Sequence, residues 1–217
     1  RGVPPSGLSC LPRIRPSLPR NVLGLILAHP ASLGKRSQGW RRAAAARDGV
    51  CGGRNPPASP PGASADTIPC VIRPLRRREV PAVSALIQNT VLVSNSADYG
   101  LEVIGALLEH FSRAGLRALA ARRRIFVYER AGRICGVIGL EAGAVGNLFV
   151  APDEQGRGIG QQLLQHVEGV ARELGLDRLT LDSSLTAVGF YERLGYRRIG
   201  EPSGGRLGST IPMEKRL

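Results

Sequence analysis

The spacing of apolar side chains changes several times along residues 71–217, and each change predicts a different element. Val71–Leu75 reads as a short strand, and Arg78–Val93 carries an apolar stripe at helical spacing. After a polar stretch, Tyr99–Phe111 shows a second helical stripe, and Leu116–Ala121 adds one or two turns. The first part of this region is therefore predicted to be mainly helical.

The next segment has the pattern of strands. Ile125–Glu129 and Arg133–Glu141 flank Ala131–Gly132, which we interpret as the turn of a β-hairpin. Ala144–Val150 follows as a third strand. This part of the chain therefore predicts an antiparallel set of neighbouring strands.

From Gly158 the helical period returns, and it ends at Gly175, a residue type common just beyond a helix. The remaining predicted elements are a strand, a short helix and a closing strand pair: Arg178–Asp182, Ala187–Leu194, Tyr196–Gly200 and Thr210–Arg216. The resulting order, β-α-α-β-β-β-α-β-α-β-β, predicts an α/β domain.

Residues 1–70 lack this periodicity and differ in composition. They hold ten of the 30 Lys and Arg residues, two of the 17 acidic residues and eleven of the 16 prolines. Ordering a residue's backbone costs roughly 1–2 kcal/mol, which scattered apolar side chains cannot offset. We therefore expect a disordered extension over 1–70 and one domain over 71–217. A targeting segment around the apolar run Val22–Ala28 is the alternative, although the run is far too short to span a bilayer.

The basic tail, the cysteines and the histidines carry little chemistry. The tail's charges are dispersed and its one aromatic residue is Trp40, so neither nucleic-acid nor membrane binding is expected. No disulfide or metal-ligand spacing is present, which favours a reducing, cytoplasmic setting. Cys135 is expected to be a buried, inert thiol, and His166 is expected on a solvated helix face.

A glycine-rich segment, Q-G-R-G-I-G at Gln155–Gly160, lies between a predicted strand and a predicted helix. Glycine lets the backbone approach an anion closely, and the first amides of a helix lack intrahelical partners. The helix dipole contributes only about 0.3–1 kcal/mol, whereas each hydrogen bond to a charged phosphate contributes roughly 1.5–3 kcal/mol. Converging N–H groups should therefore dominate anion binding, and Arg157 would add a positive charge.

Three kinds of phosphate loop have similar glycine spacing. A Walker A loop requires a Gly-Lys pair followed by Ser or Thr, and the segment contains no lysine. A dinucleotide fingerprint requires a third glycine where Gln161 stands. The remaining pattern, Gln/Arg-x-x-Gly-x-Gly/Ala, belongs to acyl-CoA pyrophosphate loops and is matched by Gln155, Gly158 and Gly160.

The surrounding sequence resembles the GNAT superfamily of acetyl-CoA-dependent N-acetyltransferases over about 147 residues. The resemblance rests on L-F-V-A-P before the loop, the loop itself, L-x-L-D-S-S from Leu179, and A-V-G-F-Y-E-R-L-G-Y over Ala187–Tyr196. It implies the GNAT acyl-CoA N-acyltransferase fold, a mixed and mostly antiparallel sheet flanked by helices. The stretch around Tyr99 further resembles an uncharacterised bacterial branch of the superfamily.

The resemblance also implies a reaction, in which an amine attacks the acetyl-CoA thioester directly within a ternary complex. Acetyl-CoA would be a co-substrate, and no metal is expected. Tyr191 would act as the general acid toward the CoA thiolate; its alternative role is packing beside Phe190. The residues implied in donor binding are Leu148, Phe149, Val150, Gln155, Gly156, Arg157, Gly158, Ile159, Gly160, Gln161 and Ser184. Ser184 stands where many members have Asn.

A second departure affects the proton acceptor. Gly146 and Asn147 stand on the central strand where many members carry an acidic residue, and Asn cannot accept the amine's proton. We expect a water-mediated route to Glu141, or to a distant group such as Glu102; the alternative for Glu141 is a solvated hairpin end. The departure also leaves open an acyl-CoA-binding module without catalysis. The expected partners are a small-molecule or peptide amine and, as an assembly, a homodimer.

Overall fold

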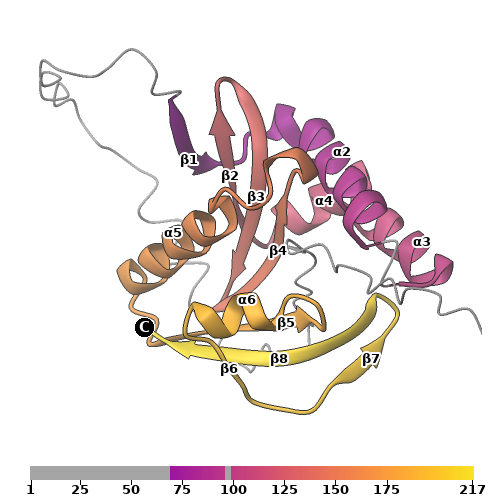
Figure 1. Cartoon of the computed structure of the whole chain (residues 1–217). Helices are drawn as coiled ribbons and strands as arrows, with labels where there is room; N and C mark the ends of the chain where they lie inside the picture. Colours follow the sequence, from indigo (N-terminus) through magenta and orange to yellow (C-terminus); the bar gives the residue numbers. More distant parts are fainter. Residues whose placement is uncertain (1–68, 96–98) are drawn as a thin grey trace, which may run out of the picture.

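The computed structural model describes residues 69–95 and 99–217, arranged as in Figure 1. Its strands are β1 (Cys70–Pro74), β2 (Arg124–Arg130), β3 (Arg133–Glu141), β4 (Ala144–Val150), β5 (Arg178–Ser184), β6 (Arg197–Arg198), β7 (Ser203–Gly205) and β8 (Gly208–Arg216). Its helices are α2 (Val80–Thr90), α3 (Leu101–His110), α4 (Arg113–Ala120), α5 (Ile159–Glu173) and α6 (Val188–Arg193), with short helical turns η2 (Arg77–Glu79), η3 (Val91–Asn95) and η4 (Pro152–Glu154).

The strands form one sheet in the order β1-β2-β3-β4-β5-β8-β6, and β7 pairs with β8. The pairings are antiparallel except that of β4 with β5, which is parallel. Ala131 and Gly132 both have positive φ in the turn between β2 and β3, which suits a tight hairpin turn. The predicted mixed, mostly antiparallel sheet flanked by helices is confirmed.

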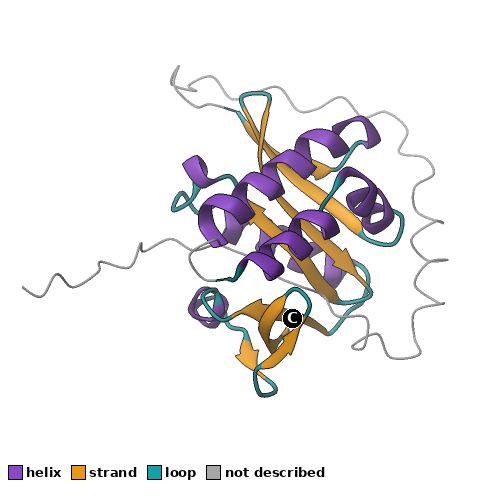
Figure 2. Ribbon diagram, turned by 90° about the vertical axis from the view of Figure 1, so that its right-hand side faces the viewer, coloured by secondary structure: helices purple, strands orange, loops and turns teal. Residues whose placement is uncertain are grey.

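Two hydrophobic cores lie on opposite faces of this sheet. One is shared with α5 and α6, and the other with α2, α3 and α4. Figure 2 shows the helices packed over the strands of the larger part of the sheet. Side chains along β4 alternate between the cores: Leu148 and Val150 belong to the first and Phe149 to the second. Because both faces of β4 are covered, its sequence is almost continuously apolar.

The sheet divides between β4 and β5. Ala144 and Thr180 are the one position at which these described strands pair, and Thr180 N donates to Gly143 O at 2.9 Å. Beyond that point β4 follows β3, whereas β5 pairs with β8 along its whole length. Figures 1 and 2 show the result, one part of the sheet made by β1–β4 and another made by β5–β8.

The predicted elements between residues 71 and 217 are present, and one strand is additional. The turns predicted over Leu116–Ala121 belong to a longer helix, α4. Helix α4 begins at Arg113, where Ser112 Oγ accepts a hydrogen bond from Gly115 N at 3.2 Å as an N-cap. Strand β7 was not predicted, because Ser203–Gly205 has no alternation of apolar side chains. The predicted extension lies outside the described residues as far as residue 68, and β1 begins at Cys70.

The predictions for the two isolated residues had different outcomes. Cys135 is buried, and burial raises the pKa of its thiol, as expected for an inert core cysteine. The prediction for His166 is wrong. Its ring packs edge-to-face on Phe126 with centroids 4.7 Å apart, and burial lowers its pKa. A histidine ring has an apolar body and a polar edge, so it can pack on an aromatic side chain instead of facing water.

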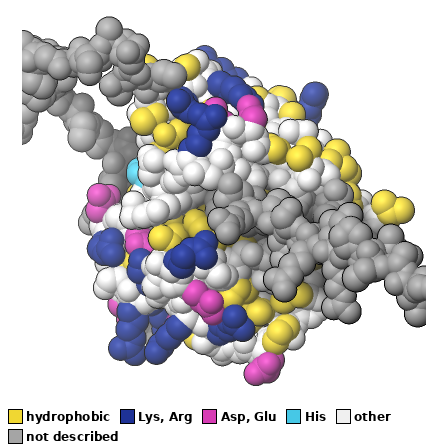
Figure 3. All heavy atoms as spheres, viewed as in Figure 1, with side chains coloured by type: hydrophobic (Ala, Val, Ile, Leu, Met, Phe, Trp, Pro, Cys, Tyr) yellow, Lys and Arg dark blue, Asp and Glu magenta, His cyan; other side chains and the backbone are white. Residues whose placement is uncertain are grey.

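No helix within 69–95 and 99–217 combines the length and the apolar composition needed to cross a membrane. Among the described residues, few large apolar side chains are exposed, and Leu92, Val93 and Leu101 are three of them. Figure 3 shows hydrophobic side chains on the surface over α2 and α3, while basic and acidic side chains are interspersed elsewhere on that face.

Candidate active site

Gln155–Gly160 forms a turn that leads directly into α5. Gly156 and Gly158 have φ angles of 77° and 78°, a region that L side chains rarely adopt, so the backbone itself requires glycine at both positions. Gly158 is the N-cap residue of α5 and has no side chain to cap the first amides; the first turn carries no acidic residue. The start of α5 therefore has the geometry and the local charge of an anion site.

Two polar side chains of this turn already have partners. Gln155 Nε2 donates to Val150 O at 3.1 Å and to Ser94 Oγ at 3.2 Å, which ties the turn to the end of β4 and to η3. Arg157 keeps more than half of its side chain exposed, and its Nε lies 3.4 Å from Glu154 Oε2. Backbone amides, rather than the Gln155 side chain, are thus the groups that this arrangement offers to an anion.

A bulge interrupts β4 next to the residues predicted to bind the donor. Pairing with β3 passes from Val137 opposite Phe149 to Gly139 opposite Gly146, so β4 has one residue more than β3 over this interval. Asn147 lies in the bulge with a φ of 56°, in the left-handed region that Asn tolerates better than most residues. A bulge redirects the backbone groups of its strand, which is a frequent feature beside active sites.

A buried polar cluster holds this bulge. Arg123 Nε donates to Glu141 Oε2 at 2.8 Å, and its Nη1 donates to Asn147 Oδ1 at 2.9 Å. All three residues are buried, at 8%, 9% and 1% exposure. Burial lowers the pKa of Arg123, and its hydrogen bond to Glu141 opposes that effect. Within the described residues, Asn147 Nδ2 is buried without a hydrogen-bond partner.

Arg123 was not predicted as a site residue. It stands in an Arg122–Arg123–Arg124 run at the start of β2, and nothing in the sequence separates it from its neighbours. The structure also places Glu141 away from solvent, so it is not the exposed hairpin end that was the alternative. Its carboxylate is linked to the β4 bulge through one arginine.

Tyr191 lies on α6 and is 2% exposed. Its ring centroid is 4.9 Å from that of Phe190 and 5.9 Å from that of Tyr196, both in edge-to-face geometry. Tyr191 shares a core with Leu148 and Ile159, so it lies on the α5 side of the sheet. Burial raises the pKa of its hydroxyl well above the usual value, and the hydroxyl therefore stays protonated at neutral pH.

Ser184 lies at the end of β5 and is fully buried. Its Oγ is 3.3 Å from Thr186 Oγ1, and its carbonyl accepts a hydrogen bond from Ser183 Oγ at 2.8 Å. These contacts order the turn between β5 and α6. A contact of the Ser184 side chain with CoA stays a prediction.

A family model described as the acetyltransferase (GNAT) domain matches residues 96–217, which is more than half of the chain. The chain belongs to the GNAT acetyltransferase family. This GNAT protein is 35% identical over 66 residues to peptidyl-lysine N-acetyltransferase YjaB of Salmonella typhimurium, a match that covers 30% of this chain and 44% of that protein. It is 29% identical over 127 residues to glucosamine 6-phosphate N-acetyltransferase of Trypanosoma brucei brucei, covering 49% of this chain and 86% of that protein.

The relatives therefore include bacterial and eukaryotic proteins, and they leave the branch within the family unresolved. The chain spans less than half the length of the Salmonella enzyme. Among solved structures, the GNAT fold is shared with a GCN5-related N-acetyltransferase of Rhodopseudomonas palustris, with a TM-score of 0.64, 22% identity, and coverage of 72% of this chain and all of that one. It is also shared with the PaiA N-acetyltransferase of Thermoplasma acidophilum in complex with coenzyme A, with a TM-score of 0.60, 18% identity, and coverage of 69% and 100%.

Acetyl-CoA use is typical of the GNAT fold, and the residues of this GNAT protein fit such a donor. The amides at the start of α5 suit a pyrophosphate, because no acidic side chain lies in that turn. The bulged end of β4 lies where β5 has already separated from it. The candidate acid, Tyr191, packs in the same core as Leu148 and Val150 of that strand.

Proposed function

We propose that this protein transfers an acetyl group from acetyl-CoA to a primary amine by direct attack in a ternary complex. The observation that carries the proposal is the turn at Gln155–Gly160, whose two left-handed glycines present the first amides of α5 beside the end of β4. Hydrogen bonds to charged phosphates contribute roughly 1.5–3 kcal/mol each. Several of them at one helix start would bind the donor without a lysine in the loop.

The reaction then requires four contributions from the chain. The edge of β4 over Leu148–Val150 aligns the pantetheine arm, and a backbone N–H near Val150 faces the thioester oxygen as it gains charge. The amine nitrogen forms a bond to the acetyl carbon, and the carbon–sulfur bond breaks. Tyr191, which keeps its proton because it is buried, donates that proton to the departing thiolate.

The amine must also lose a proton. Glu141 is the candidate acceptor, through a water molecule, because Asn147 cannot take the proton. Glu141 Oε2 accepts a hydrogen bond from Arg123, which leaves Oε1 as the oxygen for that water. Arg123 thereby connects the proposed base to the bulge that carries Asn147.

The acceptor class follows from the relatives that the chain resembles. Those proteins are named for acetylation of peptidyl lysine and of glucosamine 6-phosphate, and both carry a primary amine. A primary amine is therefore the proposed acceptor group.

The experiment measures release of CoA thiol from acetyl-CoA with a panel of primary amines, using the full chain. Calorimetric binding of acetyl-CoA provides a separate test, with ATP and NADH as control ligands. We expect saturable acetyl-CoA binding and amine-dependent thiol release. Equal binding of all three cofactors, or none, would contradict the assignment of the loop.

A second candidate function is an acyl-CoA-binding module without catalysis. Asn147 favours it, because an amide replaces the usual acidic residue and is held by Arg123. Tight acetyl-CoA binding with no thiol release on any amine, including glucosamine 6-phosphate and lysine peptides, would support this alternative.

A further inference from the structure

A pocket of about 500 Å³ lies between α3, α4 and the turn that joins β7 to β8. Its polar side chains are Glu109 and His110 from α3, Arg122 after α4, and Arg206 from the turn. The rest of its lining is apolar or small. The pocket therefore offers two guanidinium groups, one carboxylate and one imidazole in a partly apolar hollow.

The pocket joins the two parts of the divided sheet. Helices α3 and α4 pack on the face of β1–β4 that is opposite α5, whereas the β7–β8 turn belongs to the β5–β8 part. The ring of Tyr99, just before α3, packs so closely on Gly208 that a Cβ there would come within 2.6 Å of Tyr99 Cε1. A ligand in the pocket would therefore touch both parts of the sheet, on the face away from α5.

The β4 bulge is hydrogen-bonded to the residue that follows Arg122 of the pocket. Arg123 directly follows the pocket residue Arg122, and its guanidinium reaches Asn147 at 2.9 Å. His110, on the pocket wall, lies close enough to Arg123 for that charge to lower the pKa of its imidazole. The pocket and the β4 bulge are thus neighbouring features, because Arg122 of the pocket and Arg123 of the bulge cluster are consecutive residues.

The charge in the pocket is positive. Arg122 has no ion pair with any of the described residues. Arg206 pairs with Glu109, but both side chains are more than two thirds exposed, and exposed ion pairs are weak and easily exchanged. Burial lowers the pKa of His110, and Arg123, Arg122 and Arg206 lower it further. The imidazole is therefore neutral at physiological pH and provides a hydrogen bond without charge.

We propose that this pocket binds the anionic group, a carboxylate or a phosphate, of an amine acceptor whose amino group extends toward the β4 bulge. The inference rests on the proposed acetyl transfer and adds the acceptor's charge to it. Guanidinium groups bind carboxylate and phosphate in bidentate geometry, so Arg122 and Arg206 would select such acceptors over neutral or cationic amines. Glu109 competes with the ligand for Arg206.

The test compares acceptors matched in their amine and different in charge. Phosphoethanolamine is compared with ethanolamine, γ-aminobutyrate with its amide, and spermidine serves as a cationic amine. We expect kcat/KM to be about 10-fold or more higher for the anionic member of each matched pair at low salt. The difference should shrink as ionic strength rises, because exposed charges are screened. The larger effect in the phosphate or the carboxylate pair identifies the group that the pocket prefers.

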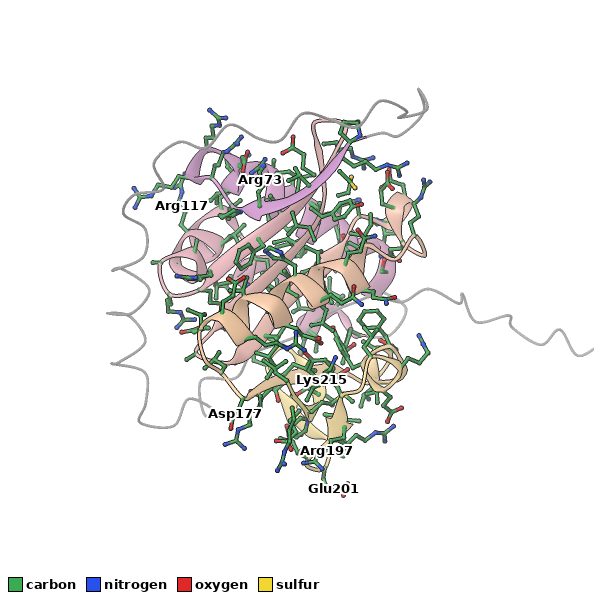
Figure 4. The ribbon with its side chains drawn as sticks, turned by 90° about the vertical axis from the view of Figure 1, so that its left-hand side faces the viewer. Arg73, Arg117, Asp177, Arg197, Glu201 and Lys215 are labelled. Carbon is green, nitrogen blue, oxygen red and sulfur yellow. The ribbon has the colours of Figure 1, made fainter. Side chains whose placement is uncertain are left out.

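Three variants are expected to change KM for phosphoethanolamine, two of them upward and one downward. R122Q and R206Q should each raise KM for phosphoethanolamine about 10-fold and leave KM for ethanolamine unchanged. E109Q should lower KM for phosphoethanolamine, because it releases Arg206 from its competitor. R117Q is the control: Arg117 is an exposed arginine of the same helix α4, labelled in Figure 4, and it does not line this pocket.

Calorimetric titration of phosphoethanolamine into the full chain with CoA present measures the same selectivity without turnover. If no amine supports thiol release, the proposed function fails, but the titration still decides whether the pocket binds an anion. Equal kcat/KM within each matched pair, equal binding by R122Q and the native protein, or weaker binding by E109Q would overturn the inference while leaving acetyl transfer intact.

Discussion

Glu141→Gln is the substitution that separates the two roles the structure gives to Glu141. The side chains of Arg123 and Glu141 are only 5% and 11% exposed, and they lie 2.8 Å apart. Breaking a buried ion pair by removing one partner costs about 3–5 kcal/mol, because the other charge is left uncompensated. Gln keeps an oxygen that can accept from Arg123, so we expect a loss near the lower limit, about 2–3 kcal/mol in the free energy of unfolding.

Calorimetry or urea denaturation measures this loss. For a domain of this size, 1 kcal/mol corresponds to roughly 2–4 °C in Tm, so E141Q should melt about 4–12 °C lower. The double variant R123M/E141Q should lose less than the sum of the two single variants, because neither charge is then left alone in the core.

Turnover is measured at a temperature at which E141Q is fully folded. If Glu141 accepts the amine's proton through a water, kcat should fall about 10²- to 10⁴-fold, and R123M should not restore it. A kcat and a pH profile equal to those of the native protein would refute the base assignment. An unchanged Tm would refute the ion-pair reasoning instead, so the two conclusions fail separately.

Three further substitutions have definite expected outcomes. Y191F should lower kcat about 10²-fold with little change in Tm, because the ring stays packed and only the hydroxyl proton is lost. The pH profile of kcat for the native protein should show no ionisation of Tyr191 near neutral pH, since burial raises its pKa. Equal rates for Y191F and the native protein would remove Tyr191 from the acid role. G158A should raise KM for acetyl-CoA and destabilise the fold by about 1–2 kcal/mol, because Gly158 has a φ of 78°. G169A is the control, because Gly169 lies within a helix and an added Cβ there would have nothing within 4 Å. K215M should cost about 1.5–3 kcal/mol of unfolding free energy, because Glu168 would lose the hydrogen bonds from Lys215 Nζ at 2.8 and 2.9 Å under α5 (Figure 4). Glu168 would keep only the weaker pairing with the more exposed Arg172, whose Nη2 lies 3.9 Å away. An unchanged Tm would mean that Arg172 or water replaces the lysine.

Local patterns predicted most of the helices and strands, and the resemblance to the GNAT superfamily implied how the sheet is arranged. The stripe that begins at Ile159 predicts α5, and its members form the core under that helix. The left-handed turn at Gly158 and the continuous apolar run of β4 follow from local rules about glycine and buried strands. Strand β7 was missed because its pairing with β8 is a long-range backbone interaction that Ser203–Gly205 does not signal in its side chains.

The site was less predictable, because its polar contacts join residues far apart in the sequence. Arg123 and Asn147 are separated by 24 positions, and the pairings of β2 with β3 and of β3 with β4 bring them together. Gln155 matches the loop pattern, yet its amide bonds to Val150 O and Ser94 Oγ, a contact that depends on where η3 ends. Motif spacing identifies the backbone that could bind an anion, but it does not identify the hydrogen-bond partners of the side chains.

The substitution of Asn147 for an acidic residue changes the charge of the site rather than merely removing a base. Arg123 is paired with Glu141, so the bulge of β4 carries a neutral ion pair whose guanidinium contacts Asn147, where many family members place an anion. Without the usual additional carboxylate, this position attracts a protonated amine less strongly. The pKa of an approaching amine is then raised less than an extra carboxylate would raise it, which leaves a larger neutral, nucleophilic fraction. Because Glu141 already pairs with Arg123, an acidic residue at 147 would be a second buried carboxylate beside a single arginine, and its absence leaves a site that holds cationic acceptors less strongly.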